Sequence, residues 1–124
     1  MQINSYRDLK VWQAAMTLAE QVYSLSDDFP KTEIYGLTTQ VRRAAVSVAA
    51  NIAEGHGRET SGAFVQFLRI AQGSLKETET HIILSERLGF AQSEKASGAL
   101  ELCDELGRMM RGLIRALQEK GPNR

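Results

Sequence analysis

The stretch that decides the fold is residues 42–55, which read RRAAVSVAANIAEG. Its apolar residues recur every three or four positions, which is the spacing of one face of an α-helix. Most of them are alanine or valine, and small side chains let two helices approach each other closely. The stretch ends on Gly55, which we expect to cap the helix in a left-handed conformation. It therefore predicts a helix that packs tightly against its neighbours.

Three further segments show the same helical periodicity and are separated by short turns. Together the four segments predict helices over about residues 8–25, 34–54, 61–88 and 94–119. Capping residues support these starts, namely Ser5 for the first helix, Thr60 or Ser61 for the third and Ser93 for the fourth. Gly89 is expected to end the third helix. No alternation of apolar and polar residues is long enough to predict a sheet. The sequence therefore predicts one all-α domain over residues 1–124, an antiparallel up-down-up-down four-helix bundle.

The composition excludes several classes of protein. Fifteen basic and fifteen acidic side chains give a formal net charge of zero, whereas dedicated nucleic-acid binders usually carry a basic excess. A neutral chain also has little charge repulsion between its own copies. The single cysteine, Cys103, suits a reducing compartment. With no signal-peptide core and no membrane-spanning apolar run, we expect a cytoplasmic protein with no membrane partner.

The first and last predicted helices have wider apolar faces than a lone bundle needs. On the first helix the apolar arc is about 200° wide, where a bundle helix needs little more than about 100°. Either both helices are deeply packed within one chain, or the excess surface binds a second copy. A long exposed apolar patch is unusual for a monomer, which favours self-association. The candidate interface residues are Val11, Leu18, Leu25, Leu102 and Met109.

No pattern predicts a metal or cofactor site. The di-iron bundle motif needs a glutamate three residues before a histidine, and neither His56 nor His81 has one. Cys103 falls on a core position, where a buried, inert thiol is expected. We therefore expect no metal and no cofactor.

A polar stripe beside the core of the second helix is the main candidate for a functional site. It consists of Gln40, Arg43, Ser47, Asn51 and Glu54. In one interpretation the stripe is a hydrogen-bond network that fixes the register of two packed helices. In the other, Ser47, Asn51, Glu54 and His56 form a small-ligand-binding or hydrolytic cluster. Nothing nearby builds a nucleophile elbow or an oxyanion hole, which favours the first interpretation and a protein that is not an enzyme.

A sparse set of basic side chains is the candidate nucleic-acid contact, and a symmetric assembly would multiply it into a basic ring. These residues are Arg42, Arg43, Arg58, Arg69 and Lys76. On the last helix, acidic residues precede Arg108, Arg111 and Arg115. That order suits the helix dipole and predicts ion pairs between residues four apart.

Three stretches of the chain resemble a known family. They are residues 6–12 (YRDLKVW), residues 29–55 (FPK, then YGLTTQVRRAAVS and NIAEG) and residues 67–77 (FL, then AQGSLKE). In order and spacing they are similar to four-helix-bundle proteins encoded by intervening sequences of large-subunit ribosomal RNA genes. The accessory proteins of diversity-generating retroelements are related to the same family.

The resemblance implies a left-handed bundle and a homo-oligomer, with a ring of five subunits as the expected assembly. It implies a non-enzymatic scaffold or adaptor whose candidate partners are further copies of itself and RNA or a nucleoprotein. The chain has Ala49 where the family usually has proline, and Gln72 where arginine is common. Ala49 should leave the second helix straighter, and Gln72 removes a positive charge.

Overall fold

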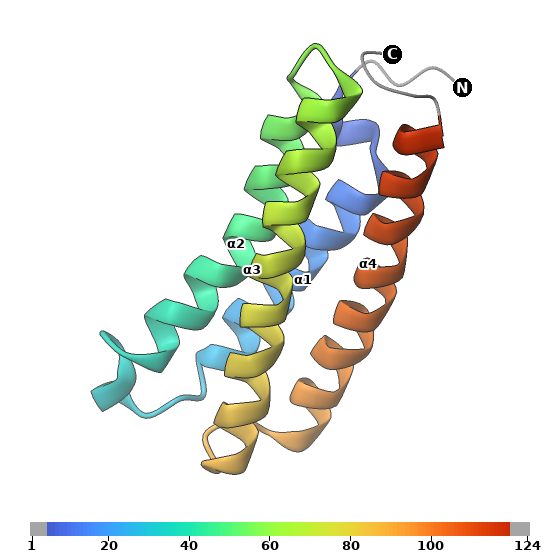
Figure 1. The fold of residues 1–124 in the computed structure, drawn as a ribbon. Helices are drawn as coiled ribbons and strands as arrows, with labels where there is room; N and C mark the ends of the chain where they lie inside the picture. Colours follow the sequence, from blue (N-terminus) through green and yellow to red (C-terminus); the bar gives the residue numbers. More distant parts are fainter. Residues whose placement is uncertain (1–4, 120–124) are drawn as a thin grey trace.

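The computed structural model describes residues 5–119, which form a bundle of four long helices (Figure 1). The helices are α1 (Lys10–Ser26), α2 (Leu37–His56), α3 (Ser61–Arg87) and α4 (Ser93–Glu119). Consecutive helices run in opposite directions, and α1 also packs against α4, so every helix has two neighbours. The part of the chain that the structure describes contains no strand. The predicted all-α up-down-up-down bundle is confirmed.

Two short 3-10 helices explain why α1 and α2 start later than predicted. Ser5 caps the first of them, η1 (Tyr6–Asp8), where its Oγ accepts a hydrogen bond from the backbone N–H of Arg7 at 3.1 Å. Helix α1 then begins at Lys10 with no side-chain cap. The second, η2 (Lys31–Glu33), follows Pro30, and the Glu33 carboxylate accepts a hydrogen bond from the backbone N–H of Leu37 at 3.1 Å. Asp8, assigned by the periodicity to the first helix, therefore belongs to η1, and residues 34–36, assigned to the second helix, form the turn that follows η2.

The ends of α2 and α3 show one confirmed and one wrong prediction about glycine. As predicted, Thr60 caps α3, since its Oγ1 accepts a hydrogen bond from the backbone N–H of Ala63 at 3.1 Å. Gly89, just beyond α3, has φ 77°, the left-handed conformation that ends many helices. Gly55 does not, because α2 continues through it to His56. Its role is instead to allow close packing.

The wide apolar face of α1 lies mostly inside the bundle, because α1 packs against both α2 and α4. Val11, Leu18 and Leu25 are 5%, 0% and 0% exposed. The prediction that these three residues form an interface with a second copy is therefore wrong, since their own chain covers them. Leu102 and Met109 are half-buried and pack against the same core.

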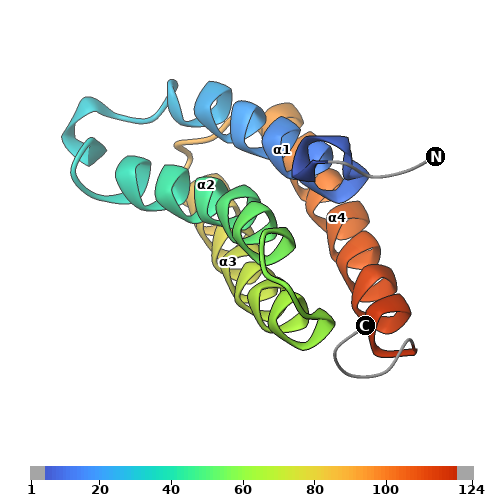
Figure 2. The ribbon, with the colours of Figure 1, turned by 90° about the horizontal axis from the view of Figure 1, so that it is seen from above.

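The connection between α1 and α2 projects beyond the helices when the bundle is seen from above (Figure 2). At its base, the ring of Phe29 packs against Phe90 of the α3–α4 connection, with centroids 6.1 Å apart. At its far side, Ile34 and Tyr35 are 47% and 95% exposed. The connection is thus anchored to the core but presents apolar side chains to solvent. No helix among residues 5–119 is long and apolar enough to cross a membrane.

Candidate functional site

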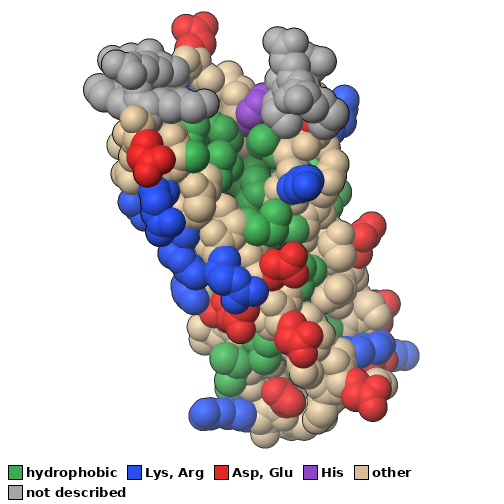
Figure 3. Space-filling model, turned by 90° about the vertical axis from the view of Figure 1, so that its right-hand side faces the viewer, with side chains coloured by type: hydrophobic (Ala, Val, Ile, Leu, Met, Phe, Trp, Pro, Cys, Tyr) green, Lys and Arg blue, Asp and Glu red, His purple; other side chains and the backbone are tan. Residues whose placement is uncertain are grey.

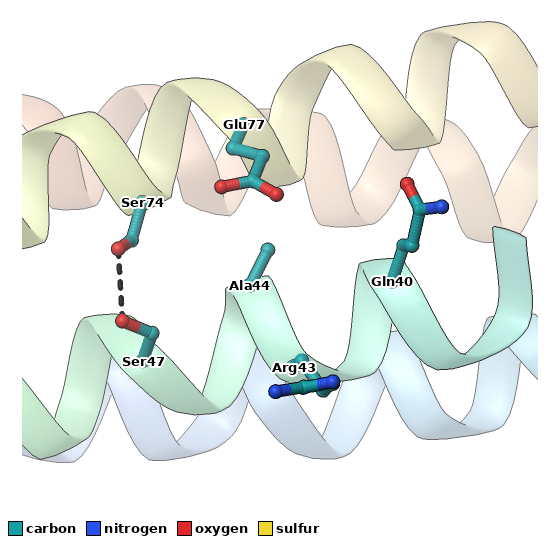
Figure 4. A pocket seen from close by; sticks show the side chains of 6 residues that line it. All are labelled: Gln40, Arg43, Ala44, Ser47, Ser74 and Glu77. Atoms are coloured by element: carbon teal, nitrogen blue, oxygen red, sulfur yellow. Dashed lines mark hydrogen bonds between the residues drawn. The ribbon is translucent and has the colours of Figure 1, made fainter.

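The polar stripe of α2 meets α3 in a hydrogen-bonded seam (Figure 4). The hydroxyl oxygens of Ser47 and Ser74 lie 2.9 Å apart and share a hydrogen bond between the two helices. The side-chain amide of Asn51 donates to the carbonyl oxygen of Ser47 at 2.9 Å and to its hydroxyl at 3.0 Å. Ser47 and Asn51 therefore belong to a network that fixes the register of α2 against α3, as the first interpretation of the stripe predicts.

Gly55 brings the two helices together one turn beyond this network. A Cβ atom at this position would lie 2.6 Å from Cβ of Phe67 and 3.0 Å from Cδ1 of Phe64. The contact with Phe67 is shorter than real Cβ atoms show, so a larger residue at this position would force α2 and α3 to shift apart. A glycine inside a helical pattern often marks close packing, but glycine is also the residue that most often ends a helix, so the sequence alone does not distinguish the two roles.

The remaining members of the predicted ligand-binding cluster have other neighbours. Glu54 forms an ion pair with Arg58 at 2.9 Å, on the surface and one turn along the chain. The ring of His56 packs edge-on against Phe64, with centroids 5.8 Å apart and planes at 84°. Asn51 bonds to Ser47, and Ser47 bonds to Ser74 of α3. The structure does not bring the four residues to one site.

An open groove of about 330 Å³ lies over the seam beside the two serines. Its lining residues are Gln40, Arg43, Ala44, Ser47, Ser74 and Glu77 (Figure 4). The Glu77 carboxylate lies 3.3 Å from Nε2 of His81, the surface pair expected from their spacing. Within residues 5–119, neither serine is hydrogen-bonded to the histidine or carboxylate that activates a nucleophilic hydroxyl.

Among the described residues, Cys103 has a thiol whose pKa is strongly raised. It is fully buried on the inner face of α4, and this burial, with Glu79 and Asp104 adding to it, raises the pKa of its thiol from 9.0 to about 12. The thiol is therefore protonated at neutral pH, and it is the thiolate that reacts or binds metals. No group of three His, Cys, Asp or Glu side chains within residues 5–119 could hold a metal ion.

Arg42, a predicted nucleic-acid contact, ties α2 to the end of α1. Its Nε donates to the hydroxyl of Ser26 at 2.7 Å, and its Nη2 donates to the carboxylate of Asp27 at 2.9 Å. The guanidinium also lies 4.6 Å from the centroid of the Tyr23 ring, in the position of a cation–π contact. The guanidinium of Arg42 thus makes its hydrogen bonds and its ring contact with residues of α1 and the turn after it.

The other four predicted contacts divide into two pairs. Arg58 bonds to Glu54 and covers the ring of Phe67 at 4.7 Å, and Lys76 forms an ion pair with Glu79 at 3.2 Å. Arg43 and Arg69 are exposed and have no ion pair among the described residues, although Arg69 donates to the side-chain amide oxygen of Gln72 at 3.3 Å. Of the five predicted contacts, Arg43 and Arg69 are therefore the two without a counterion within residues 5–119.

The basic half of α4 carries three more free charges, which we did not predict as a site. Arg108, Arg111 and Arg115 are exposed, and the expected ion pairs with residues four positions away do not form within the described part of α4. The space-filling view shows Lys and Arg side chains gathered in a band on this side of the molecule, with several acidic side chains below it (Figure 3). The ordering of charges along the helix was the only signal in the sequence.

A second unpredicted surface is apolar and lies on the solvent-facing sides of α1 and α2. Tyr23, Val46 and Ala50 line an open groove of about 430 Å³ together with Arg42, Arg43 and Ser47. Met16 extends this surface along α1, because it lies seven residues, or two helical turns, before Tyr23. The side chains of Met16, Tyr23 and Val46 are 40%, 46% and 46% exposed. We call these four residues, Met16, Tyr23, Val46 and Ala50, the outer apolar strip.

Comparison with known proteins agrees with this architecture. A solved structure with a similar fold is that of a protein of unknown function from the S23 ribosomal protein family of Bacteroides thetaiotaomicron, with a TM-score of 0.77 and 21% identity. The match covers 84% of this chain and 97% of that one. No protein of curated function matches the chain. The model of the family described as 23S rRNA-intervening sequence protein matches residues 7–112. The chain therefore belongs to the 23S rRNA-intervening sequence protein family.

Proposed function

We propose that the protein is a non-enzymatic scaffold that assembles from several copies of itself and associates with RNA or a nucleoprotein. The expected assembly is a ring of five subunits. The observation that carries the proposal is the outer apolar strip, where three large apolar side chains are about two-fifths to one-half exposed on two adjacent helices. Contiguous apolar surface of this kind is characteristic of interfaces.

A second copy of the chain fits this strip better than an unrelated partner does. A closed ring joins two different patches of each subunit, so each subunit must present both of them. The chain presents a second exposed apolar patch at Ile34 and Tyr35, on the projecting α1–α2 connection. Zero net charge adds little repulsion between copies. We infer that the strip of one subunit receives the connection of the next.

The scaffold role rests on where the polar groups are used. Ser47 and Ser74 hydrogen-bond α2 to α3, and Asn51 donates to Ser47 within α2. The raised pKa of the Cys103 thiol keeps this thiol protonated at neutral pH. The side chains on the surface that have no partner among the described residues include charged and apolar groups. Such groups are suited to binding rather than to bond-breaking chemistry.

The test is the change Val46→Glu, with Ile70→Glu as its control. Val46 and Ile70 are both exposed apolar residues, 46% and 53%, but Ile70 lies on α3, outside the strip. A carboxylate desolvated at an apolar interface is costly, so Val46→Glu should convert the assembly into monomers, as measured by light scattering after gel filtration. Ile70→Glu should leave the assembly intact. A Val46→Glu protein that assembles like the wild type would contradict the proposed interface.

A further inference from the structure

The outer face of α4 carries a row of arginines that have no counterion in the part of the chain that the structure describes. Arg108, Arg111 and Arg115 are three and four residues apart, which places them on one side of the helix. All three are exposed, and none has an ion pair within residues 5–119. Along the helix axis the row spans seven residues, or about 10 Å.

A fourth arginine without a counterion among the described residues, Arg69, lies at the same level on α3. The two helices touch where Gly107 faces Leu75, since a Cβ atom on Gly107 would lie 3.7 Å from the Leu75 side chain. From this point α3 and α4 run in opposite directions, so the N-terminal part of α3 lies beside the C-terminal part of α4 (Figure 1). Arg69 is six residues, about 9 Å, along α3 from the crossing, between the levels of Arg111 and Arg115 on α4. We call Arg69, Arg108, Arg111 and Arg115 the arginine ridge.

The chemistry of the arginine ridge fits a chain of phosphates. Guanidinium groups bind phosphate oxygens through two parallel hydrogen bonds, and all four basic residues here are arginine. The phosphates of one strand repeat about every 3.4 Å along the axis of a duplex and lie further apart in an extended single strand, so a row of about 10 Å can meet two to three successive phosphates. The exposed residue between the arginines of the row is Gly112, so the row has no apolar or aromatic anchor of the kind that dominates protein–protein interfaces.

We propose that the arginine ridge binds the phosphate backbone of single-stranded nucleic acid without reading its sequence. The inference deepens the RNA association proposed above and rests on it. Base recognition needs stacking side chains or directed contacts to base edges, and the ridge provides only guanidinium groups. Four neutralised phosphates predict that the logarithm of affinity falls with the logarithm of salt concentration with a slope of about 2.8.

The test measures the anisotropy of labelled 20-mers of uridine RNA and thymidine DNA with the full-length chain, at salt concentrations from about 50 to 200 mM. The ridge variant is Arg108→Gln/Arg111→Gln/Arg115→Gln. Its control is Lys10→Gln/Lys31→Gln/Arg87→Gln, which removes the same charge from exposed residues that also have no ion pair within residues 5–119. Circular dichroism melts check that both variants fold.

For the wild type we expect affinity to fall about 50-fold over this salt range, because a fourfold change in salt is raised to a power of about 2.8. The ridge variant should lose at least about tenfold in affinity at 50 mM salt, and its slope should fall to about 0.7, the value for one remaining contact. The control should change affinity less than about threefold, and RNA and DNA should bind within a few-fold of each other, because the 2′-hydroxyl is not read.

Different failures have different meanings. Equal affinities and slopes for the ridge variant and its control would overturn the ridge inference and leave RNA association standing. A more than tenfold preference for RNA over DNA would also overturn it, since backbone phosphates are common to both. No binding by the wild type at 50 mM salt would remove both the ridge and the RNA association. Self-assembly would then still be tested by the oligomeric state of the Val46→Glu variant.

Discussion

The seam between α2 and α3 and the outer face of α4 use polar residues in opposite ways. In the seam, Ser47, Asn51 and Ser74 bond to one another, and none of the buried side-chain N and O atoms in the described chain lacks a hydrogen-bond partner. On α4, Arg108, Arg111 and Arg115 point away from the core without a counterion among residues 5–119.

The difference separates residues that hold the bundle together from residues that remain available to partners. Both sets are polar and both lie on helices, so composition alone does not distinguish them. What distinguishes them is whether a neighbouring helix satisfies the polar atom. Substitutions in the seam should therefore change stability, whereas substitutions on the arginine ridge should change binding.

The largest effect on stability is expected at Gly55, where α2 and α3 are closest. Gly55→Ala would place a Cβ atom 2.6 Å from Phe67, so the helices must separate, and we expect a loss of about 2–3 kcal/mol in the free energy of unfolding. The control is Gly73→Ala on α3, which meets nothing within 4 Å and should stabilise the protein by about 0.5–1 kcal/mol through helix propensity. Urea denaturation measures both. Equal effects of the two changes would show that the seam is not tightly packed.

A smaller effect is expected for Asn51→Leu, which removes the donor to both oxygen atoms of Ser47. We expect a loss of about 1–2 kcal/mol, because the half-buried carbonyl and hydroxyl oxygens lose that partner. Gln66→Leu serves as the control, since this exposed amide on α3 has no hydrogen bond to the described chain. Thermal melts that are identical for Asn51→Leu and the wild type would mean that the network does not contribute to the stability of the seam.

The smallest effect on stability should come from Arg111→Gln on the outer face of α4. Arg111 has no ion pair among the described residues, and surface substitutions of this kind usually change stability by less than about 0.5 kcal/mol. Urea denaturation of this single variant is the measurement. A loss greater than about 1 kcal/mol would place Arg111 with the residues that hold the bundle together and would remove the contrast between the two regions.

Much of the fold could be predicted from periodicity and capping. Four apolar repeats predicted the helices, and Thr60 and Gly89 mark the limits of α3 as expected. The starts of α1 and α2 could not be placed as well, because η1 and η2 are short turns whose residues also suit an α-helix. Nor could periodicity show that Leu18 and Leu25 are covered by their own chain, since it gives the width of a face but not its neighbours.

The candidate site was predicted less well, because it depends on contacts between distant residues. The polar stripe of α2 was visible, but its partner Ser74 lies 27 residues beyond Ser47, and helix rotation decides which side chains meet. The link from Arg42 to Asp27 spans 15 residues and a turn. On α4 the rule for residues four apart predicted ion pairs that the structure does not contain within its described part, because solvated side chains gain little from such pairs.

The most direct test of the account is the molar mass of the full chain in solution, measured by light scattering over a range of micromolar concentrations. The single chain has a mass of 13.7 kDa. The account predicts one species near five times this mass, because the outer apolar strip and the projecting connection are covered only when subunits meet. A species of 13.7 kDa at every concentration would contradict self-assembly and with it the proposed scaffold.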